Sequence, residues 1–461
     1  FEDFAREMAK LKNEKHFDYL VTIIGEDFGE EGLGCIYILE NTENNERCSV
    51  RTIAKKVDGS DVIPTVINLW KSADLLEREV FDFVGIKFLG HPDMRRLFLR
   101  TDFKGHPLRK DFDMSPEANK FPLTDEPESD YTVEYNLDAD DHLTETKHRL
   151  FTDDDYVVNI GPNHPSTHGV LRLQTVINGE TVKRIYPHLG YIHRGIEKMW
   201  EGMTYPQTLA LTDRLNYLSA MMHRHALVGV IEEAMGIELS DRIRYIRTIM
   251  DELQRIDSHL LFLGCTAQDL GALTAFLYCM RDREHVLNVM EETTGGRLIM
   301  NYYRIGGLQA DIDPNFVENT KKLCKYLRPK IQEYLDVFGD NVITHNRLVG
   351  VGPMDKENCI NYGVTGPAGR AAGWKNDTRK RHPYDMYDKV EWKEITMTGC
   401  DSMDRYYVHI KELYQSLDII EQLIDNIPEG EFYIKQKPII KVPEGQWYFS
   451  VEGASGEFGI Y

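Results

Sequence analysis

Two histidines stand four residues apart in a short polar segment, and imidazole binds metals, moves protons and donates hydrogen bonds near neutral pH. His164 and His168 lie between Gly161-Pro162 and Gly169. On a helix this spacing would place both rings on one face, as a metal pair requires. Pro165 and the flanking glycines favour a loop instead. Such a loop could present His168 to a ligand, but the motif alone is explained more simply by a histidine that bonds to local backbone.

Further polar motifs follow the histidine loop and carry side chains that could donate protons or hold a fixed charge. Arg194 stands in His193-Arg194-Gly195, Tyr217 follows Asp213-Arg214-Leu215-Asn216, and Asp269 opens Asp269-Leu270-Gly271-Ala272. A phenol can donate a hydrogen bond to a carbonyl and release a proton, and a carboxylate can fix the tautomer of an imidazole. Taken singly, each motif also fits a helix cap, a buried ion pair or a turn glycine.

The elements that must position these residues fall into two parts. Residues 1–112 are typical of a compact α/β unit, with strands expected at 19–24, 35–39 and 48–57 and a helical period over 62–84.

An acidic linker is expected at residues 113–150. Eight carboxylates lie from Asp125 to Asp141, and the prolines of the segment are Pro116, Pro122 and Pro127. A segment that is acidic, interrupted by prolines and poor in aliphatic residues cannot bury enough apolar surface to fold alone. The domain boundary is therefore placed near residue 150.

Residues 151–461 are expected to form a helical bundle with small attached sheets, which makes the whole chain α+β. Short strands are expected at 156–160 and 170–176, and long helices at about 207–235, 240–262, 270–292, 313–338 and 400–426. The longest apolar stretch, His259 to Met280, contains Asp269 near its middle. A central carboxylate is costly in a bilayer, so this stretch is interpreted as a buried helix pair.

Composition restricts the classes of function. A net charge of −21 disfavours a nucleic-acid binder and a chain that attaches itself to anionic lipid. None of the seven cysteines forms a C-x-x-C pair, which fits a reducing compartment and removes the usual signature of an iron–sulfur or zinc site. His91 and His106 each precede a proline without a well-spaced third ligand, so they are assigned to turns and no metal site is expected.

Two sets of motifs resemble one protein family. The segment from Leu76-Glu77-Arg78-Glu79 to Asp111-Phe112 closely resembles the signature of the C subunit of respiratory complex I, the proton-pumping NADH:quinone oxidoreductase. The later motifs, from the His168 loop to Gly456-Glu457-Phe458-Gly459, resemble in order the D subunit over about residues 156–461. The chain is thus similar to the C–D fusion of some bacteria. In that family the C domain is structural, so no catalytic residue is assigned there.

The resemblance implies a role for each candidate residue. Reducing a quinone takes two electrons and two protons, and the quinone head offers only carbonyl acceptors, so the site must supply proton donors. The resemblance assigns the donors to His168 and Tyr217 and places Asp269 behind His168 to orient it. It places Arg194 close to a [4Fe–4S] cluster of an adjacent subunit, where a positive charge would favour the reduced cluster. Many members carry His where Ile299 stands, which puts pH-linked tuning from that position in doubt.

The resemblance also implies the setting. Quinone is the substrate and this chain holds no metal or cofactor of its own; FMN and NADH bind elsewhere in the complex. The expected partners are the iron–sulfur subunit with the terminal [4Fe–4S] cluster, other peripheral-arm subunits and the membrane-arm subunit at the quinone channel. The expected location is peripheral, on the cytoplasmic side of the bacterial inner membrane. Ubiquinone and menaquinone both remain open, and a further C-terminal tail is expected beyond Tyr461.

The D-subunit fold resembles the large subunit of nickel–iron hydrogenases, which offers an alternative function. A hydrogenase needs four thiolates, from one C-x-x-C near each end of that domain. Leu189-Gly190-Tyr191-Ile192 occupies the place of the first pair, and the C-terminal sequence has no second pair. A membrane-bound hydrogenase-related subunit is therefore disfavoured. The intact set of His168, Tyr217 and Asp269 argues against the other alternative, a scaffold without a ligand site.

Overall fold

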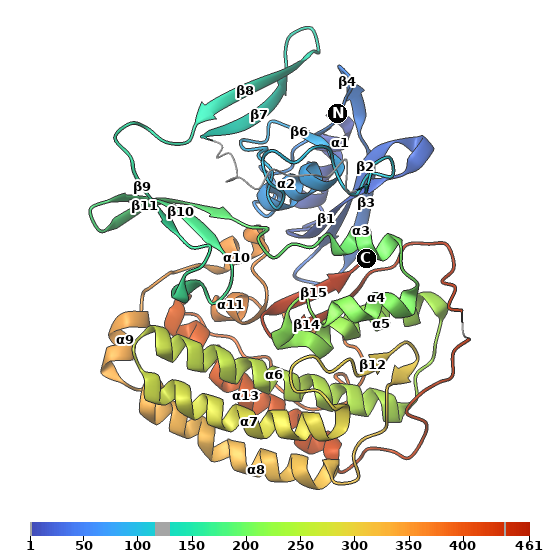
Figure 1. The fold of residues 1–461 in the computed structure, drawn as a ribbon, viewed down its shortest axis with the longest axis vertical. Helices are drawn as coiled ribbons and strands as arrows, with labels where there is room; N and C mark the ends of the chain where they lie inside the picture. The colour runs from blue at the N-terminus through green and yellow to red at the C-terminus, as the bar shows by residue number, and fades with distance from the viewer. Residues whose placement is uncertain (1, 116–129, 438) are drawn as a thin grey trace. The chain divides into compact units, whose positions relative to one another are not determined.

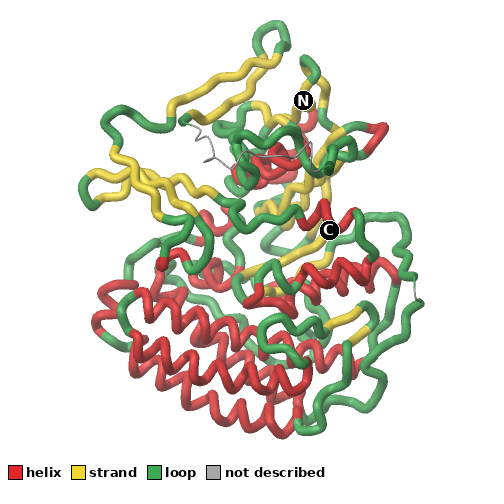
Figure 2. The backbone as a smooth tube through the Cα atoms, viewed as in Figure 1, coloured by secondary structure: helices red, strands yellow, loops and turns green. Residues whose placement is uncertain are grey.

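The structure is a computed structural model that describes residues 2–115, 130–437 and 439–461. The chain divides into two compact units. The first unit comprises Phe1–Gly202 with Asn361–Gly363, and the second comprises Met203–Ile360 with Val364–Tyr461. Strands are concentrated in the first unit and helices dominate the second (Figure 2). The expected mixture of small sheets with a helical domain is confirmed.

Within its described residues, the first unit contains three sheets. One sheet has the order β1 Tyr19–Asp27, β2 Leu33–Glu40 and β3 Arg47–Ile53. The second has the order β4 Lys55–Val57, β5 Ser60–Pro64, β6 Lys87–Leu89, β7 Tyr131–Leu137 and β8 Leu143–Arg149. The third has the order β11 Thr181–His188, β10 Arg172–Asn178 and β9 Tyr156–Ile160. The helices and short helical turns are α1 Glu2–Asn13, η1 Gly29–Glu31, α2 Ala73–Val84, η2 Pro165–Thr167 and α3 Ile196–Glu201.

The core of the first unit lies between the β1–β3 sheet and helix α2. Every residue of β2 is buried, as expected for the central strand of a covered sheet. Helix α2 approaches β1 so closely that a Cβ at Gly25 would lie 2.7 Å from the Cγ1 atom of Val80. Glycine at this position therefore permits the helix to pack directly on the strand.

The turn-rich segment after β6 folds around one buried carboxylate. Asp82 of α2 accepts three backbone hydrogen bonds through Oδ2, from the N–H groups of Leu97, Phe98 and Leu99. Its Oδ1 lies 2.8 Å from Arg96 Nη1. His106 Nδ1 lies 3.0 Å from the backbone carbonyl of Asp82. Hydrogen bonds to Asp82 thus hold residues 96–106, the turn-rich part of the C-subunit signature, against α2.

Glu77 gives the first unit a testable pH dependence. Burial raises its pKa to about 8 from 4.5, while hydrogen bonds from Thr65 and Val66 act in the opposite direction. Folding therefore takes up a proton between these two pH values. The free energy of unfolding should fall as pH rises through that window, by up to about 1.4 kcal/mol per pH unit.

Replacing Glu77 with Gln should remove this contribution, because the amide keeps an acceptor for Val66 and a donor for Thr65 without a proton to lose. Urea unfolding at pH 5 and pH 8 measures the effect. Glu7→Gln, at an exposed position of α1, is the matched control and should keep the wild-type slope. An unchanged difference between the two pH values in Glu77→Gln would contradict the assignment.

The structure corrects two expectations for the first half. The helical period over 62–84 holds only from Ala73 onward, because residues 60–64 form β5 and pair with β6. Part of the expected linker 113–150 is an antiparallel hairpin, β7 with β8, whose first strand joins β6. Partner strands supply the hydrogen bonds that an acidic segment alone lacks. Residues 116–129, with the three linker prolines, lie outside the described residues.

The second unit is mainly helical. The helices α6 Asp241–Asp269, α7 Leu273–Thr294, α8 Phe316–Tyr334 and α13 Ser402–Ile424 pack as a bundle (Figure 1). Shorter elements are α4 Tyr205–Thr212, η3 Tyr217–Ser219, α5 Ala220–Met235, η4 Leu335–Gly339, α9 Val342–Leu348, α10 Lys356–Tyr362, α11 Gly366–Ala371 and α12 Thr378–Arg381; the last two residues of α10 belong to the first unit. Two hairpins complete it: β12 Tyr303–Arg304 with β13 Gly307–Leu308, and β14 Phe449–Gly453 with β15 Gly456–Ile460.

The expected long helices are confirmed with one change. The segment expected at 207–235 is divided into α4 and α5, with Tyr217 in the connection between them. The apolar stretch from His259 to Met280 is the helical hairpin of α6 and α7. A Cβ at Gly264 of α6 would lie 3.2 Å from the Cβ of Cys279 on α7, so these helices are in close contact.

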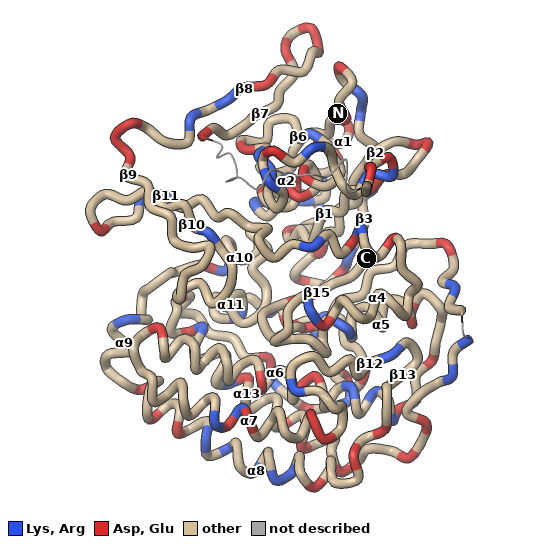
Figure 3. The backbone as a smooth tube through the Cα atoms, viewed as in Figure 1, with Lys and Arg blue, Asp and Glu red and all other residues tan. Residues whose placement is uncertain are grey.

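Charged positions are spread along the bundle helices (Figure 3). None of the helices in the three described ranges combines the length and the apolar character that a bilayer span requires.

Candidate functional site

His168 lies at the end of the loop that joins β9 to β10. It follows the 3-10 turn η2 and has a left-handed backbone, with φ of 49°. His164 caps the same turn, since its Nδ1 accepts the N–H of Ser166 at 3.2 Å. A Cβ at Gly161 would lie 1.9 Å from the carbonyl oxygen of Leu171, so the loop closes tightly at its base. The predicted loop is confirmed, and the His168 side chain is exposed on it.

Arg194 lies in an exposed turn that precedes α3. Its neighbour His193 stacks on two aromatic rings, with centroid distances of 4.8 Å to Phe83 and 5.4 Å to Phe98. A Cβ at Gly190 would lie 2.0 Å from the carbonyl oxygen of Phe98. The residues of α2 and of the segment after β6 therefore position the Arg194 turn. Sequence reasoning missed this role, because nothing in either motif indicates its contact.

Tyr217 opens the 3-10 turn η3 and is 50% exposed. The side chain of Asn216 caps the turn, accepting the N–H of Leu218 at 3.1 Å. From α6, the Nε2 atom of Gln254 donates to the carbonyl of Leu218 at 3.3 Å. The phenol therefore projects from a turn that is hydrogen-bonded on two sides.

A buried ion pair holds the chain just before this turn. Asp213 is fully buried, and its Oδ1 lies 2.5 Å from Arg224 Nε on α5. The other carboxylate oxygen accepts the N–H of Asn301 at 2.8 Å. Arg224 also donates to the carbonyls of Leu209 and Tyr303. These contacts explain why α4 and α5 are separate helices: Asp213 bends the chain toward residues 301–303.

Asp269 is the last residue of α6 and is exposed. It lies fifteen residues after Gln254, about 22 Å further along the helix axis. Tyr217 and Asp269 thus belong to one unit: the turn of Tyr217 is bonded to the middle of α6 through Gln254, and Asp269 ends the same helix. His168 and Arg194 belong to the other compact unit. The predicted arrangement of His168 with Tyr217 and Asp269 stays a prediction.

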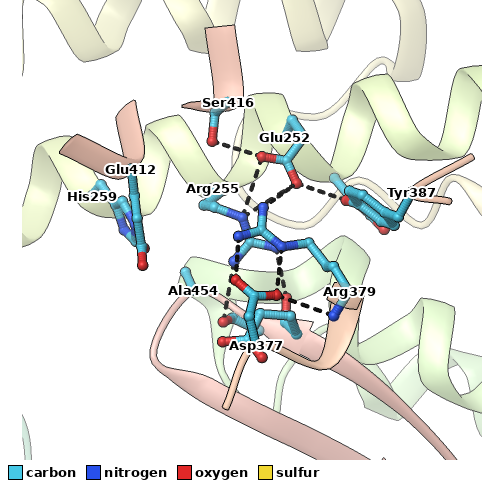
Figure 4. A network of polar contacts seen from close by, with 12 residues as sticks. Glu252, Arg255, His259, Asp377, Arg379, Tyr387, Glu412, Ser416 and Ala454 are labelled. Carbon is cyan, nitrogen blue, oxygen red and sulfur yellow. Dashed lines mark hydrogen bonds and ion pairs between the residues drawn. The ribbon is translucent and has the colours of Figure 1, made fainter. Parts of the chain in front are cut away.

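The interior of the second unit contains a buried network of charges that sequence reasoning did not identify (Figure 4). Its acidic members are Glu252, Asp377, Glu412 and Glu452, and its basic members are Arg255, Arg370 and Arg379. All seven side chains are at most 3% exposed. They come from α6, α13, β14 and the segment around α11 and α12, so the network connects elements that are distant in sequence.

Charge partners and hydrogen bonds keep Glu252 of this network ionised. Burial by itself disfavours the charge on Glu252, yet Arg255, Arg379 and hydroxyl donors lower its pKa to about 2. Those hydroxyls are Ser416 Oγ at 2.6 Å and the Tyr387 hydroxyl at 2.7 Å. The network therefore has a structural role, because every oxygen of Glu252 is occupied by protein donors.

A histidine is also held between carboxylates inside this unit. His225 Nδ1 lies 2.6 Å from Asp251 Oδ2, and its Nε2 lies 3.2 Å from Asp385 Oδ2. Burial opposes the charged ring, but the two carboxylates raise the pKa of His225 to about 9. The ring is thus a buried imidazolium at neutral pH. Sequence reasoning missed this histidine. The available signal was the four-residue spacing of Arg247, Asp251 and Arg255, which places charged side chains, including the partner of His225, on one face of α6.

In the described part of the chain, no group of three or more His, Cys, Asp or Glu side chains is arranged to hold a metal ion. His91 Nε2 lies 3.1 Å from the carbonyl oxygen of Asp74, and its Nδ1 accepts the N–H of Asp93. The two His-Pro histidines are thus bonded to backbone, as the assignment to turns requires.

Comparisons with known proteins give the family. The model of the family "Respiratory-chain NADH dehydrogenase, 30 Kd subunit" matches residues 2–118, and that of the 49 Kd subunit matches residues 269–461. The C/D subunit of the NADH-quinone oxidoreductase of Phocaeicola vulgatus is 55% identical over 460 residues, covering 100% of this chain and 88% of the relative. The C/D 2 subunit of the Aquifex aeolicus enzyme is 37% identical over 476 residues, covering 99% and 80%.

A relative named as a D subunit matches about two thirds of this chain. The D 2 subunit of the NADH-quinone oxidoreductase of Opitutus terrae is 44% identical over 306 residues, covering 66% of this chain and 77% of the relative. Both expected halves are therefore found, in the expected order and in one chain. The chain belongs to the family of fused C/D subunits of NADH-quinone oxidoreductase, the peripheral-arm subunits of respiratory complex I.

Proposed function

We propose that this chain forms part of the quinone-reduction site of a proton-translocating NADH:quinone oxidoreductase. The observation that carries the proposal is the 55% identity to a C/D subunit over the whole chain. His168 and Tyr217 hydrogen-bond the quinone carbonyls, and Asp269 orients the His168 ring. Two electrons and two protons convert the quinone to the quinol, and His168 and Tyr217 are the proton-bearing groups at its carbonyls.

The position of Tyr217 suits this role. A quinone carbonyl needs a donor whose place does not change between substrate and product, and the turn of Tyr217 is fixed by Asn216 and Gln254. The phenol is half exposed, so a ligand can reach it. Those two properties distinguish it from Tyr303 and Tyr387, whose hydroxyls are buried and already bonded to carboxylates.

The surface near Asp269 suits an apolar ligand or partner. Phe262 on α6 is 37% exposed, and Leu273 and Leu277 at the start of α7 are 56% and 54% exposed. Large apolar side chains that remain exposed together mark binding surfaces. We assign this end of the α6–α7 hairpin to the quinone and to the membrane-arm subunit at the quinone channel.

The remaining assignments follow the family. Electrons arrive from a terminal [4Fe–4S] cluster of a neighbouring iron–sulfur subunit, and the exposed charge of Arg194 lies toward it. FMN and NADH bind other subunits, and the chain sits peripherally on the cytoplasmic side of the inner membrane. Residues 1–112 and 151–461 act as the C and D domains. The D domain has the fold of a nickel–iron hydrogenase large subunit without its thiolate ligands, and a hydrogenase function is not favoured.

Photoaffinity labelling of the assembled complex tests the proposal. A quinone analogue with a photoreactive head group should label peptides that contain Tyr217 and the His168 loop, and excess quinone should reduce that labelling. Labelling confined to other subunits, or labelling of this chain that excess quinone leaves unchanged, would show that the site lies elsewhere.

A further inference from the structure

Three polar residues connect the Tyr217 turn to the α6–α7 hairpin. Gln254 is fully buried, and its Nε2 donates both to the Leu218 carbonyl at 3.3 Å and to Asp257 Oδ2 at 3.0 Å. Asp257 in turn meets Arg283 of α7, with Oδ1 2.8 Å from Nε and Oδ2 3.3 Å from Nη2. The backbone beside Tyr217 is therefore tied through one amide to a buried ion pair.

The orientation of the Gln254 amide depends on the charge of Asp257. An ionised carboxylate only accepts hydrogen bonds, so it holds the Nε2 side of the amide. The other side, Gln254 Oε1, is buried without a hydrogen-bond partner in the described part of the chain. A protonated Asp257 could donate to that oxygen. The amide would then turn over, and an oxygen would replace the donor that faces the Leu218 carbonyl.

The surroundings of Asp257 place its protonation near neutral pH. Burial raises the pKa of Asp257 to about 6, with Arg283 acting to lower it and Glu284 to raise it. Both of these charged groups come from α7. Toward η3 the contact of Asp257 runs through the neutral side chain of Gln254.

We propose that Asp257 is a protonation-dependent positioning residue of the quinone site, acting on Tyr217 through Gln254. The inference rests on the proposed function, since it assigns a role at that site. When Asp257 is ionised, the Tyr217 turn is held and quinone binds well. When Asp257 is protonated, the turn loses its donor from α6 and binding weakens.

The experiment measures KM and kcat of the assembled complex for a short-chain, water-soluble quinone from pH 5.5 to 8. In the wild type, KM should rise as pH falls through about 6, by about five-fold, the effect of one lost hydrogen bond. Asp257→Asn presents an N–H to Gln254 at every pH and imitates the protonated state. Its KM should be high throughout and should lack the transition, with kcat changed less than KM.

Two further variants make the result decisive. Glu284→Gln removes a neighbouring exposed charge without touching Gln254, and it should keep the transition. Asp257→Leu with Arg283→Leu removes the pair without leaving a buried charge, so it folds even if Asp257→Asn does not; it should also lose the transition. A wild-type pH profile in either Asp257 variant overturns the inference. The proposed function fails by a different result, photolabelling of this chain that excess quinone leaves unchanged.

Discussion

Replacing Tyr217 with Phe is expected to lower the NADH:quinone turnover of the assembled complex by about 10²- to 10⁴-fold, the usual contribution of a positioned proton donor. The change removes one hydroxyl from a side chain that is 50% exposed, and it leaves the hydrogen bonds of the turn intact because these use Asn216 and Gln254. The loss should therefore appear in chemistry at the quinone and not in folding.

Electron entry provides the internal reference for this variant. Reduction of ferricyanide by NADH should remain at the wild-type rate, because it does not need the quinone site. Tyr362→Phe is the matched control: Tyr362 is 51% exposed in α10 and lies outside the proposed site. Its quinone turnover should equal that of the wild type. Normal quinone turnover in Tyr217→Phe would remove the phenol from the proposed mechanism.

Arg370→Met is expected to destabilise the chain by about 3–5 kcal/mol, because it leaves buried carboxylates without their partner. Arg370 is fully buried, and its guanidinium lies 2.7 Å from Glu412 Oε1 and 2.7 Å from Glu452 Oε1. Without it, two guanidiniums face four carboxylates in the interior. Urea unfolding of the purified chain, compared with the wild type at pH 7, measures the loss.

A surface ion pair of similar geometry is the control. Arg328 lies 2.6 Å from Asp418 and 2.7 Å from Glu421, but its side chain is 36% exposed. Arg328→Met should cost less than about 1 kcal/mol, since water screens exposed pairs. Adding Glu412→Met to Arg370→Met should recover part of the lost stability by removing one unpaired charge. An Arg370→Met chain as stable as Arg328→Met would refute the structural role of the network.

Local patterns predicted much of the architecture. The long helices of the second unit occur close to the residues where they were expected, and the His168 loop was expected from Pro165 and its glycines. The secondary-structure predictions were wrong where a segment pairs with a strand that is distant in sequence. Residues 60–64 are a strand because β6 pairs with them, and residues 131–149 are a hairpin because β6 accepts β7. Strand pairing depends on residues that a local window does not contain.

By itself the sequence determined the family, the order of the two parts and the residue types available for quinone chemistry, because these are properties of motifs along the chain. Only the tertiary structure decided which polar groups meet. Arg255 of α6 donates to the carbonyl of Gly453, 198 residues away, and Gln254 joins the Tyr217 turn to Asp257. Such contacts follow from the packing of distant elements, and low-dielectric burial then sets the pKa of each group.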